Sequence, residues 1–361
     1  MRLLVVRGNP RKTGYVQAFT DLFLEGARSA EADICDVDLT TKHITPCEGC
    51  YHCWIAEPGQ CIHQDDMNDL LQEFIAADVV VCATPLYYYS MSSRLQTFFE
   101  RTLPLTQAGL DEMPNGLFRN QTRFPEQWRN KKLILLVIGA LRDKANFQPF
   151  VETCRLIADG MAMELGGILV RPESHLTGFD RAKPTQIKRI RQAFIEAGRE
   201  AATSGTVSER VLQEAAACME SEQTCFKHNS DLYWDTAHKM GRSAMDTAAV
   251  VAEVSKDARI ILRQMVSSVD PLSTSQTDVT LQLDFADKDL YFCIAIDHGT
   301  ASLVEQRTEK PDLRISCDAE VWTGIATREI DPRQALREGS VKLEGNRLLF
   351  SRLARFFPVM C

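Results

Sequence analysis

The chain has 361 residues, of which 45% are hydrophobic, and carries a formal net charge of -8. This length predicts two or three domains, and the negative charge gives no reason to expect a nucleic acid or an anionic membrane surface as the main partner. No apolar run approaches the roughly 20 residues that span a bilayer, and Met1-Arg2-Leu3 begins a strand-like pattern rather than a signal peptide. We therefore expect no transmembrane segment and a cytoplasmic protein.

Residues 1–204 alternate short aliphatic runs with amphipathic segments, a pattern typical of β-α-β units on a parallel sheet. The expected strands are Arg2–Val6, Ala32–Asp36, Asp78–Ala83, Lys132–Ile138 and Ile168–Arg171. Apolar residues at helical spacing predict helices at Gln17–Ala27, Met67–Ala76, Met91–Arg101, Phe150–Leu165 and Ile187–Ala201. This order predicts an α/β domain with a flavodoxin-like, five-stranded, doubly wound parallel sheet. Such sheets bind ligands at the carboxyl ends of their strands, where the loops after the first, third and fourth strands lie.

The first of these loops is Gly8-Asn9-Pro10-Arg11-Lys12-Thr13-Gly14. Small residues let backbone N–H groups converge on an anion, the following helix adds its positive N-terminal dipole, and the basic side chains supply further donors. The loop therefore predicts a site for a phosphorylated cofactor. An ordinary strand-to-helix turn with surface cations is the alternative.

The loop after the third strand is Thr84-Pro85-Leu86-Tyr87-Tyr88-Tyr89-Ser90, at the same expected edge of the sheet. Tyrosines offer flat stacking area with a polar tip, and backbone N–H groups can satisfy the carbonyls and nitrogens of a heteroaromatic ring. We interpret the loop as a platform for a flavin. The alternative is that the tyrosines pack against a neighbouring subunit.

Together, Gly8-Asn9-Pro10-Arg11 and Thr84-Pro85-Leu86-Tyr87 resemble the two signature loops of the flavodoxin-like, NAD(P)H-dependent FMN reductase family. Asn9 stands where that family usually has serine, so a short polar side chain is kept. The resemblance implies FMN, NAD(P)H as electron donor, and a homodimer. The phosphate contacts that it implies come from Asn9, Arg11, Thr13, Gly14 and Tyr15. The implied ring contacts come from Pro85, Leu86, Tyr87 and Tyr88, with Gly139 of the loop Gly139-Ala140-Leu141-Arg142 on the other side of the ring.

Twelve cysteines are a high count, and in a reducing compartment we expect thiols, metal ligands or redox groups rather than structural disulfides. Four of them, Cys47, Cys50, Cys53 and Cys61, follow the second strand within a short span. Their spacing resembles that of the iron–sulfur flavoproteins, which implies a 4Fe–4S cluster. Flavin-only relatives keep a similar segment, so free thiols or a labile disulfide remain open. Zinc is a third alternative, with His52 able to replace one cysteine.

The pattern changes after residue 204. Residues 205–244 show short helical pieces that predict a helical connector, and residues 245–361 predict a smaller α+β domain. Its expected strands are Val279–Phe285 and Leu290–Ile296 as a hairpin, then Ala301–Glu305, Leu313–Cys317 and Val341–Gly345. Its expected helices are Asp318–Thr327, Pro332–Glu338 and Leu348–Phe357. This succession, with Glu344-Gly345-Asn346 before the last helix, resembles the sterol carrier protein domain and implies an apolar tunnel for lipids. A β-rich oligomerisation module is the alternative.

These features together predict an FMN-dependent NAD(P)H oxidoreductase that passes electrons to a small hydrophobic acceptor, such as a quinone or a lipid-like compound. A flavin enzyme mainly has to bind, orient and shield the ring, so no catalytic side chain is expected. Two alternatives remain, an iron–sulfur flavoprotein in electron transfer and a lipid-binding carrier without enzyme activity.

Overall fold

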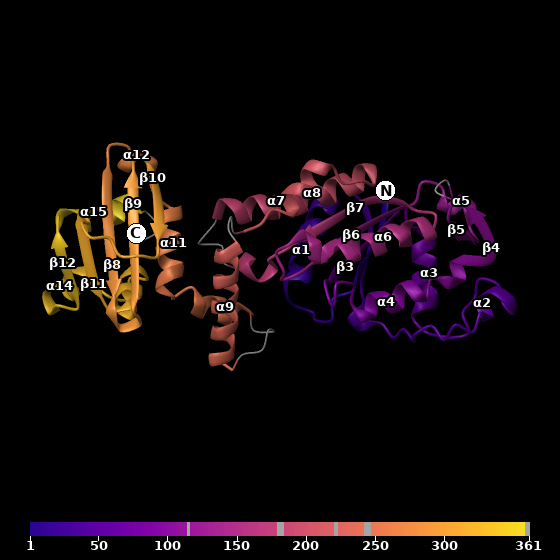
Figure 1. Ribbon diagram of the computed structural model, residues 1–361. Helices are drawn as coiled ribbons and strands as arrows, with labels where there is room; N and C mark the ends of the chain where they lie inside the picture. Colours follow the sequence, from indigo (N-terminus) through magenta and orange to yellow (C-terminus); the bar gives the residue numbers. More distant parts are fainter. Residues whose placement is uncertain (114–115, 179–183, 220–222, 242–246, 358–361) are drawn as a thin grey trace. The chain divides into compact units, whose positions relative to one another are not determined.

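The computed structural model describes residues 1–113, 116–178, 184–219, 223–241 and 247–357. The chain divides into two compact units, which are described separately (Figure 1). The first consists of Met1–Thr177 and Thr185–His228, and the second of Gly178–Pro184 and Asn229–Cys361.

The first unit is built on a five-stranded sheet in the order β2-β1-β3-β6-β7, in which every neighbouring pair is parallel. Its strands are β1 (Arg2–Arg7), β2 (Asp33–Asp38), β3 (Val79–Pro85), β6 (Lys132–Ile138) and β7 (Glu164–Arg171). All seven residues of β3 are buried. Such continuous burial is expected of a central parallel strand that is covered on both faces.

Helices cover both faces of this sheet, so the side chains of its central strands are buried whichever face they point to. The longer helices are α1 (Tyr15–Ser29), α3 (Met67–Ala76), α4 (Ser93–Glu100), α6 (Gln148–Gly160), α7 (Pro184–Ser204) and α8 (Glu209–Ala215). Side chains of α3, α4 and α6 share one core cluster with Leu4, Val80 and Leu135 of the sheet. Helices α1 and α7 lie outside this cluster and pack against each other, with the ring centroids of Phe19 and Phe194 4.6 Å apart. The predicted doubly wound flavodoxin-like fold is confirmed.

The remaining elements of this unit are short. They are α2 (His52–Ile55), α5 (Pro125–Trp128), and the 3-10 turns η1 (Leu39–Thr41), η2 (Leu103–Leu105), η3 (Lys144–Phe147) and η4 (Ser174–Gly178). A separate two-stranded antiparallel ribbon, β4 (Thr106–Glu112) with β5 (Phe118–Thr122), was not predicted. Its residues are mostly polar or exposed, so its strands lack the regular apolar alternation that identifies a half-buried strand.

The sequence-based prediction was wrong at the end of one helix. The helix expected over Phe150–Leu165 ends at Gly160, Ala162 follows with a positive φ of 57°, and β7 begins at Glu164. The apolar residues Met163 and Leu165 fit the helical pattern but belong to the turn and the strand. The start of the helix expected at Met91 lies at Ser93, because the Ser92 side chain accepts a hydrogen bond from the Leu95 N–H and caps it.

The second unit holds a mixed five-stranded sheet in the order β10-β9-β8-β11-β12. Its strands are β8 (Asp278–Phe285), β9 (Leu290–Asp297), β10 (Thr300–Val304), β11 (Leu313–Cys317) and β12 (Val341–Gly345). Strands β8 and β11 pair in parallel, and the other neighbours pair antiparallel, including the predicted β8–β9 hairpin. The predicted strands Leu313–Cys317 and Val341–Gly345 match β11 and β12 in both bounds.

Helix α9 (Gln223–Lys239) belongs to this unit from Asn229 onward. The other helices of this unit are α10 (Thr247–Val254), α11 (Ala258–Ser267), α12 (Pro271–Thr274), α13 (Ala319–Ala326), α14 (Pro332–Glu338) and α15 (Leu348–Phe356), with the turn η5 (Ala286–Lys288). The core cluster joins α11, α13 and α15 to the inner face of the sheet. Helices α10 to α12 were not foreseen from the sequence. No helix among the described residues is both long and apolar enough to cross a membrane.

Candidate functional site

The loop after β1 is held against the loop after β3 by its first residue. The Gly8 N–H donates to the Ala83 carbonyl oxygen at 2.7 Å, and the Ser92 hydroxyl donates to the Gly8 carbonyl oxygen at 2.5 Å. A Cβ atom at Gly8 would lie only 2.8 Å from Cβ of Leu95 and 3.1 Å from the Ala83 oxygen. Only glycine therefore fits this contact without displacing α4.

Asn9 is buried in the same loop, with 3% of its surface exposed. Its Nδ2 group donates to the Arg11 carbonyl oxygen, which closes the loop on itself. Its Oδ1 atom has no hydrogen-bond partner within the described part of the chain. A buried acceptor of this kind requires a donor, and the hydroxyl groups of a ribityl chain are donors of the right chemistry.

The end of the loop places positive charge at the N-terminus of α1. Gly14, the N-cap, has a φ of 124°, and a Cβ atom there would lie 3.4 Å from Nη2 of Arg11. The first turn of α1 contains no acidic residue, so the positive end of the helix dipole favours an anion there. Thr13 is exposed beside this terminus. The Tyr15 hydroxyl donates to the His175 carbonyl oxygen at 3.2 Å.

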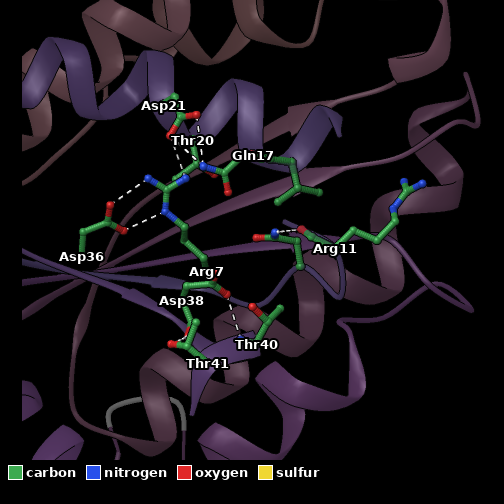
Figure 2. A network of polar contacts seen from close by, with 11 residues as sticks. Arg7, Arg11, Gln17, Thr20, Asp21, Asp36, Asp38, Thr40 and Thr41 are labelled. Carbon is green, nitrogen blue, oxygen red and sulfur yellow. Dashed lines mark hydrogen bonds and ion pairs between the residues drawn. The ribbon is translucent and has the colours of Figure 1, made fainter. Parts of the chain in front are cut away.

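A second arginine in this region serves the fold. Arg7, at the end of β1, donates from Nε and Nη2 to the two carboxylate oxygens of Asp36 at 2.7 and 2.8 Å, and from Nη1 to Asp21 at 2.7 Å. Figure 2 shows Arg7 between these two carboxylates, with Arg11 lying to the other side. Burial lowers the pKa of Arg7, but the hydrogen bonds to Asp36 and Asp21 outweigh it and hold the pKa above its ordinary value. The network ties β1 to β2 and α1, beneath the loop.

The tyrosine loop forms a tight turn after β3. The N–H groups of Tyr87 and Ser90 each donate to the other residue's carbonyl oxygen at 2.9 Å. The two residues between them, Tyr88 and Tyr89, have φ values of 46° and 63°. Such a turn favours asparagine or glycine at these positions, so tyrosines there are strained, as residues at functional sites often are. Tyr88 is 99% exposed.

The loop after β6 meets the tyrosine loop from the other side. The Leu86 N–H donates to the Ile138 carbonyl oxygen at 2.9 Å. A Cβ atom at Gly139 would lie 3.3 Å from Cβ of Leu86 and 2.9 Å from the Phe147 ring. Pro85 and Gly139 are buried, whereas Leu86 is half-buried and Tyr87 is exposed. The structure thus brings together the predicted residues of three loops, at the carboxyl ends of the adjacent strands β1, β3 and β6.

Three buried polar residues lie at the end of β7 and directly after it, and the sequence carried no signal for them. Arg171 is fully buried and donates from Nη1 to the carbonyl oxygens of Ala215 and Ala217, at the end of α8. Burial lowers its pKa to about 10, so it remains charged at neutral pH. Burial also lowers the pKa of His175 to about 4, so this ring is neutral at neutral pH. Glu173 accepts a hydrogen bond from the Met219 N–H at 2.5 Å.

The four predicted metal-ligating cysteines line one small pocket, together with His63 and Arg101. Cys53 is buried, Cys50 is exposed, and Cys47 and Cys61 are half-buried. Burial, together with the neighbouring Cys61 thiol, raises the pKa of Cys53. Across the described ranges, no three His, Cys, Asp or Glu side chains are arranged to hold a metal ion. Four cysteine thiols are the donor set that holds an iron–sulfur cluster in proteins.

A buried ion pair joins Arg101, which lines this pocket, to Asp65, which follows Cys61 in the chain. Arg101 and Asp65 have side chains that are 1% and 3% exposed, and their atoms approach to 2.8 Å. Asp65 also accepts from the N–H groups of Thr45 and Met67, at 2.8 and 3.1 Å. Burial raises the pKa of Asp65, but these hydrogen bonds and the Arg101 charge outweigh it and hold the pKa well below its usual range. This pair was not predicted from the sequence.

The second unit contains a cavity of about 850 Å³ between α13, α14 and α15. Its volume lies within the range of ligand pockets. The apolar residues that line it are Trp322, Ile325, Ile330, Leu336, Phe350 and Leu353. Charged residues, among them Arg328, Glu329, Asp331 and Arg333, complete the lining.

Comparison with known proteins agrees with both halves of this description. Residues 1–147 match the family model of NADPH-dependent FMN reductases, and residues 261–358 match that of the SCP-2 sterol transfer family. An iron–sulfur flavoprotein of Archaeoglobus fulgidus is 31% identical over 104 residues, which are 29% of this chain and 46% of that protein. The putative NAD(P)H-dependent FMN-containing oxidoreductase YwqN of Bacillus subtilis is 22% identical over 202 residues, or 55% of this chain and 96% of that protein.

The chain spans about half the length of the iron–sulfur flavoproteins that it matches. Among solved structures, an NAD(P)H:quinone oxidoreductase from Methanothermobacter marburgensis aligns with a TM-score of 0.42 and 14% identity, over 55% of this chain and 96% of that one. The two resemblances recognised in the sequence are confirmed. Residues 1–147 therefore carry a match to the NADPH-dependent FMN reductase family, and residues 261–358 carry a match to the SCP-2 sterol transfer family.

Proposed function

We propose that this protein is an FMN-dependent NAD(P)H oxidoreductase whose second unit binds an apolar ligand. The observation that carries the first part is the convergence of three loops at the carboxyl ends of β1, β3 and β6, with the unsatisfied Oδ1 of Asn9 in the first of them. This edge lies at the switch point of the sheet, where β2 and β3 flank β1.

In this proposal each loop has a distinct role. Asn9, Arg11, Thr13, Gly14 and Tyr15 would hold the ribityl phosphate, chiefly through the α1 N-terminus and the Arg11 guanidinium. Pro85, Leu86, Tyr87 and Tyr88 would contact one side of the ring, and Gly139 would allow the other side to approach the backbone. Bound FMN supplies hydride and electron transfer. The protein's own residues bind and orient it and exclude water.

Absorption spectroscopy tests this function directly. Freshly purified protein, handled without oxygen, is expected to show flavin bands that bleach when NADPH is added. A colourless protein that cannot be reconstituted with FMN would contradict the oxidoreductase proposal. It would favour a lipid carrier without enzyme activity.

For the electron acceptor we propose a small hydrophobic compound of the quinone or lipid-like class. The support is the cavity of about 850 Å³ in the second unit, with its apolar lining. Saturable binding of fatty acyl or sterol probes to the full-length protein is the expected result. Absence of binding would remove the reason for a lipid-like acceptor.

We also propose that the protein forms a homodimer. Tyr88 is almost fully exposed on a strained turn, and such an aromatic side chain is suited to an interface. Sedimentation of the wild-type protein and of Tyr88→Ser tests this, because a weaker dimer is expected only if the turn lies in the interface.

An iron–sulfur flavoprotein in electron transfer is the second candidate, because Cys47, Cys50, Cys53 and Cys61 line one pocket. Anaerobically purified protein would then contain iron and sulfide, both lost in Cys50→Ser. Flavin without iron or sulfide, in protein reconstituted under reducing conditions, would leave these residues as thiols. Zinc without sulfide would identify the remaining alternative.

A further inference from the structure

Arg101 holds together the two ends of the segment that carries the four cysteines of the pocket. Its Nη1 group donates to the Thr45 carbonyl oxygen at 2.5 Å and to Oδ2 of Asp65 at 2.8 Å, and its Nη2 group donates to Oδ1 of Asp65 at 3.0 Å. Thr45 precedes Cys47 in the chain, and Asp65 follows Cys61. One buried guanidinium therefore fixes the segment on both sides of its cysteines.

The third nitrogen of this guanidinium, Nε, is buried and has no hydrogen-bond partner among the residues that the structure describes. The two-point contact with Asp65 fixes the plane of the guanidinium and hence the direction of its Nε–H group. Arg101 also lines the cysteine pocket. Burial lowers the pKa of Arg101, but the hydrogen bond to Asp65 and the negative charge of an ionised Cys61 outweigh it and raise the pKa. The Cys61 sulfur therefore lies within the reach of this side chain.

The protonation state of Cys61 decides how well its sulfur accepts a hydrogen bond. A neutral thiol is a weak acceptor, whereas an ionised acceptor makes a hydrogen bond about twice as strong. A cysteine that ligates iron must be a thiolate. The four cysteine thiols and the orphaned Nε–H donor beside them thus fit a thiolate-ligated cluster.

We propose that Arg101 is a positioning residue of the iron–sulfur site, whose Nε–H donates a hydrogen bond to Sγ of Cys61 and thereby raises the reduction potential of the cluster. The reduced cluster carries one more electron, so a donor to its sulfur ligand stabilises the reduced form more than the oxidised form. Hydrogen bonds to the sulfurs are among the factors that set such potentials. This inference rests on the second candidate function, the iron–sulfur flavoprotein.

Arg101→Lys tests the role of the Nε–H group. Lysine keeps a positive charge for Asp65 but has no donor at the Nε position. The full-length variant, reconstituted with iron and sulfide without oxygen, is expected to hold as much of both as the wild type. In a redox titration followed by electron paramagnetic resonance, the ratio of reduced to oxidised cluster at a fixed potential should fall about 3- to 10-fold. This is a decrease of about 28 to 59 mV for one electron.

Arg123→Lys is the matched control. Arg123 donates to the backbone carbonyl oxygens of Pro104, Thr106 and Cys53 at 3.2, 3.1 and 3.4 Å, so it contacts the cysteine segment through the backbone. Its substitution should leave the potential unchanged. An unchanged potential in Arg101→Lys would overturn the proposal. An equal decrease in both variants would overturn it as well, because the effect would then reflect a general disturbance of the segment.

A spectroscopic measurement tests the same hydrogen bond with Arg101 in place. Arg123→Lys protein is labelled with arginine that carries nitrogen-15 only in its side chain, and the reduced cluster is examined by pulsed electron paramagnetic resonance. A nitrogen-15 coupling to the cluster is expected, and its absence would overturn the proposal even if Arg101→Lys holds no cluster. Reconstituted wild-type protein without iron and sulfide would instead contradict the iron–sulfur candidate, and this inference with it.

Discussion

The two candidate ligand sites are built from different parts of the chain. In the first unit, backbone loops at the ends of three neighbouring strands form the site, and Gly8 and Gly139 allow their close approach. In the second unit, side chains of α13, α14 and α15 line the cavity. A backbone site depends on short contiguous segments, whereas a side-chain cavity depends on residues that are brought together only by packing.

The two sites also differ in how they are supported. The loops of the first unit rest on buried charge, such as Arg7 with Asp36 and Asp21. The cavity of the second unit is supported by an apolar core in which Trp322 contacts Phe285. Substitutions of buried charge should therefore affect the first unit more strongly than equivalent changes at its surface.

The largest effect is expected for Asp65→Asn. Removal of this carboxylate leaves the buried Arg101 guanidinium without its counter-charge, which typically costs about 3–5 kcal/mol. Urea unfolding, followed by a signal from the first unit, should show this loss. Glu164→Gln is the control, because Glu164 is 57% exposed and lies 3.5 Å from Lys132. Its cost should stay below about 1 kcal/mol, and equal losses in the two variants would contradict the role of burial.

The same pair predicts a pH dependence. The pKa of Asp65 is depressed in the folded protein, so the unfolded chain binds its proton more readily. The pair's contribution to the free energy of unfolding is present above the unfolded pKa, about 4, and is lost as the pH falls through the lower folded value. The stability difference between wild type and Asp65→Asn should therefore shrink below about pH 4. A constant difference down to pH 2 would contradict this assignment.

The next largest effect is expected for Gly8→Ala. The added Cβ atom would lie 2.8 Å from Leu95 Cβ, and overpacking of this kind costs about 1–3 kcal/mol. FMN affinity should fall as well, because the loop is displaced from β3. Gly160→Ala is the control, because no atom lies within 4 Å of its added Cβ. If both variants retained full stability and FMN binding, the close approach at Gly8 would be unnecessary for either property.

A smaller effect, measured on cofactor binding, is expected for Asn9→Leu. It removes the buried Oδ1 acceptor and the loop-closing Nδ2 donor. FMN affinity should fall about 10-fold, the equivalent of about 1.4 kcal/mol, as measured by flavin fluorescence quenching. Asn9→Ser keeps a short polar side chain and should recover most of the affinity. Equal binding by the leucine and serine variants would contradict the proposed contact.

The smallest effect is expected for Tyr88→Gly. Glycine relieves the positive φ of 46°, so the free energy of unfolding should rise by about 1 kcal/mol. FMN affinity or dimerisation should fall in the same variant if the ring has a role. Asp289→Gly relieves a similar φ of 52° in the β8–β9 hairpin of the other unit. It should leave FMN binding unchanged, and the same result for Tyr88→Gly would remove Tyr88 from the site.

The sequence predicted the repeating architecture of both units well. The helix Met67–Ala76 and the strands Lys132–Ile138, Leu313–Cys317 and Val341–Gly345 were predicted with both bounds correct. Local apolar periodicity determines such elements. The prediction was wrong where periodicity crosses a boundary, as at Gly160, and it missed the polar ribbon β4–β5.

The sequence by itself determined the main strands and helices of both units, the family resemblance of each region and the loop segments of the proposed FMN site, because each is encoded in contiguous residues. Pairing of Arg7 with Asp36, and of Arg101 with Asp65, joins residues 29 and 36 positions apart. The lack of a partner for Nε–H of Arg101 among the described residues likewise depends on how the surrounding segments pack. These features were visible only in the folded protein, because burial and partner choice are set by packing between distant segments.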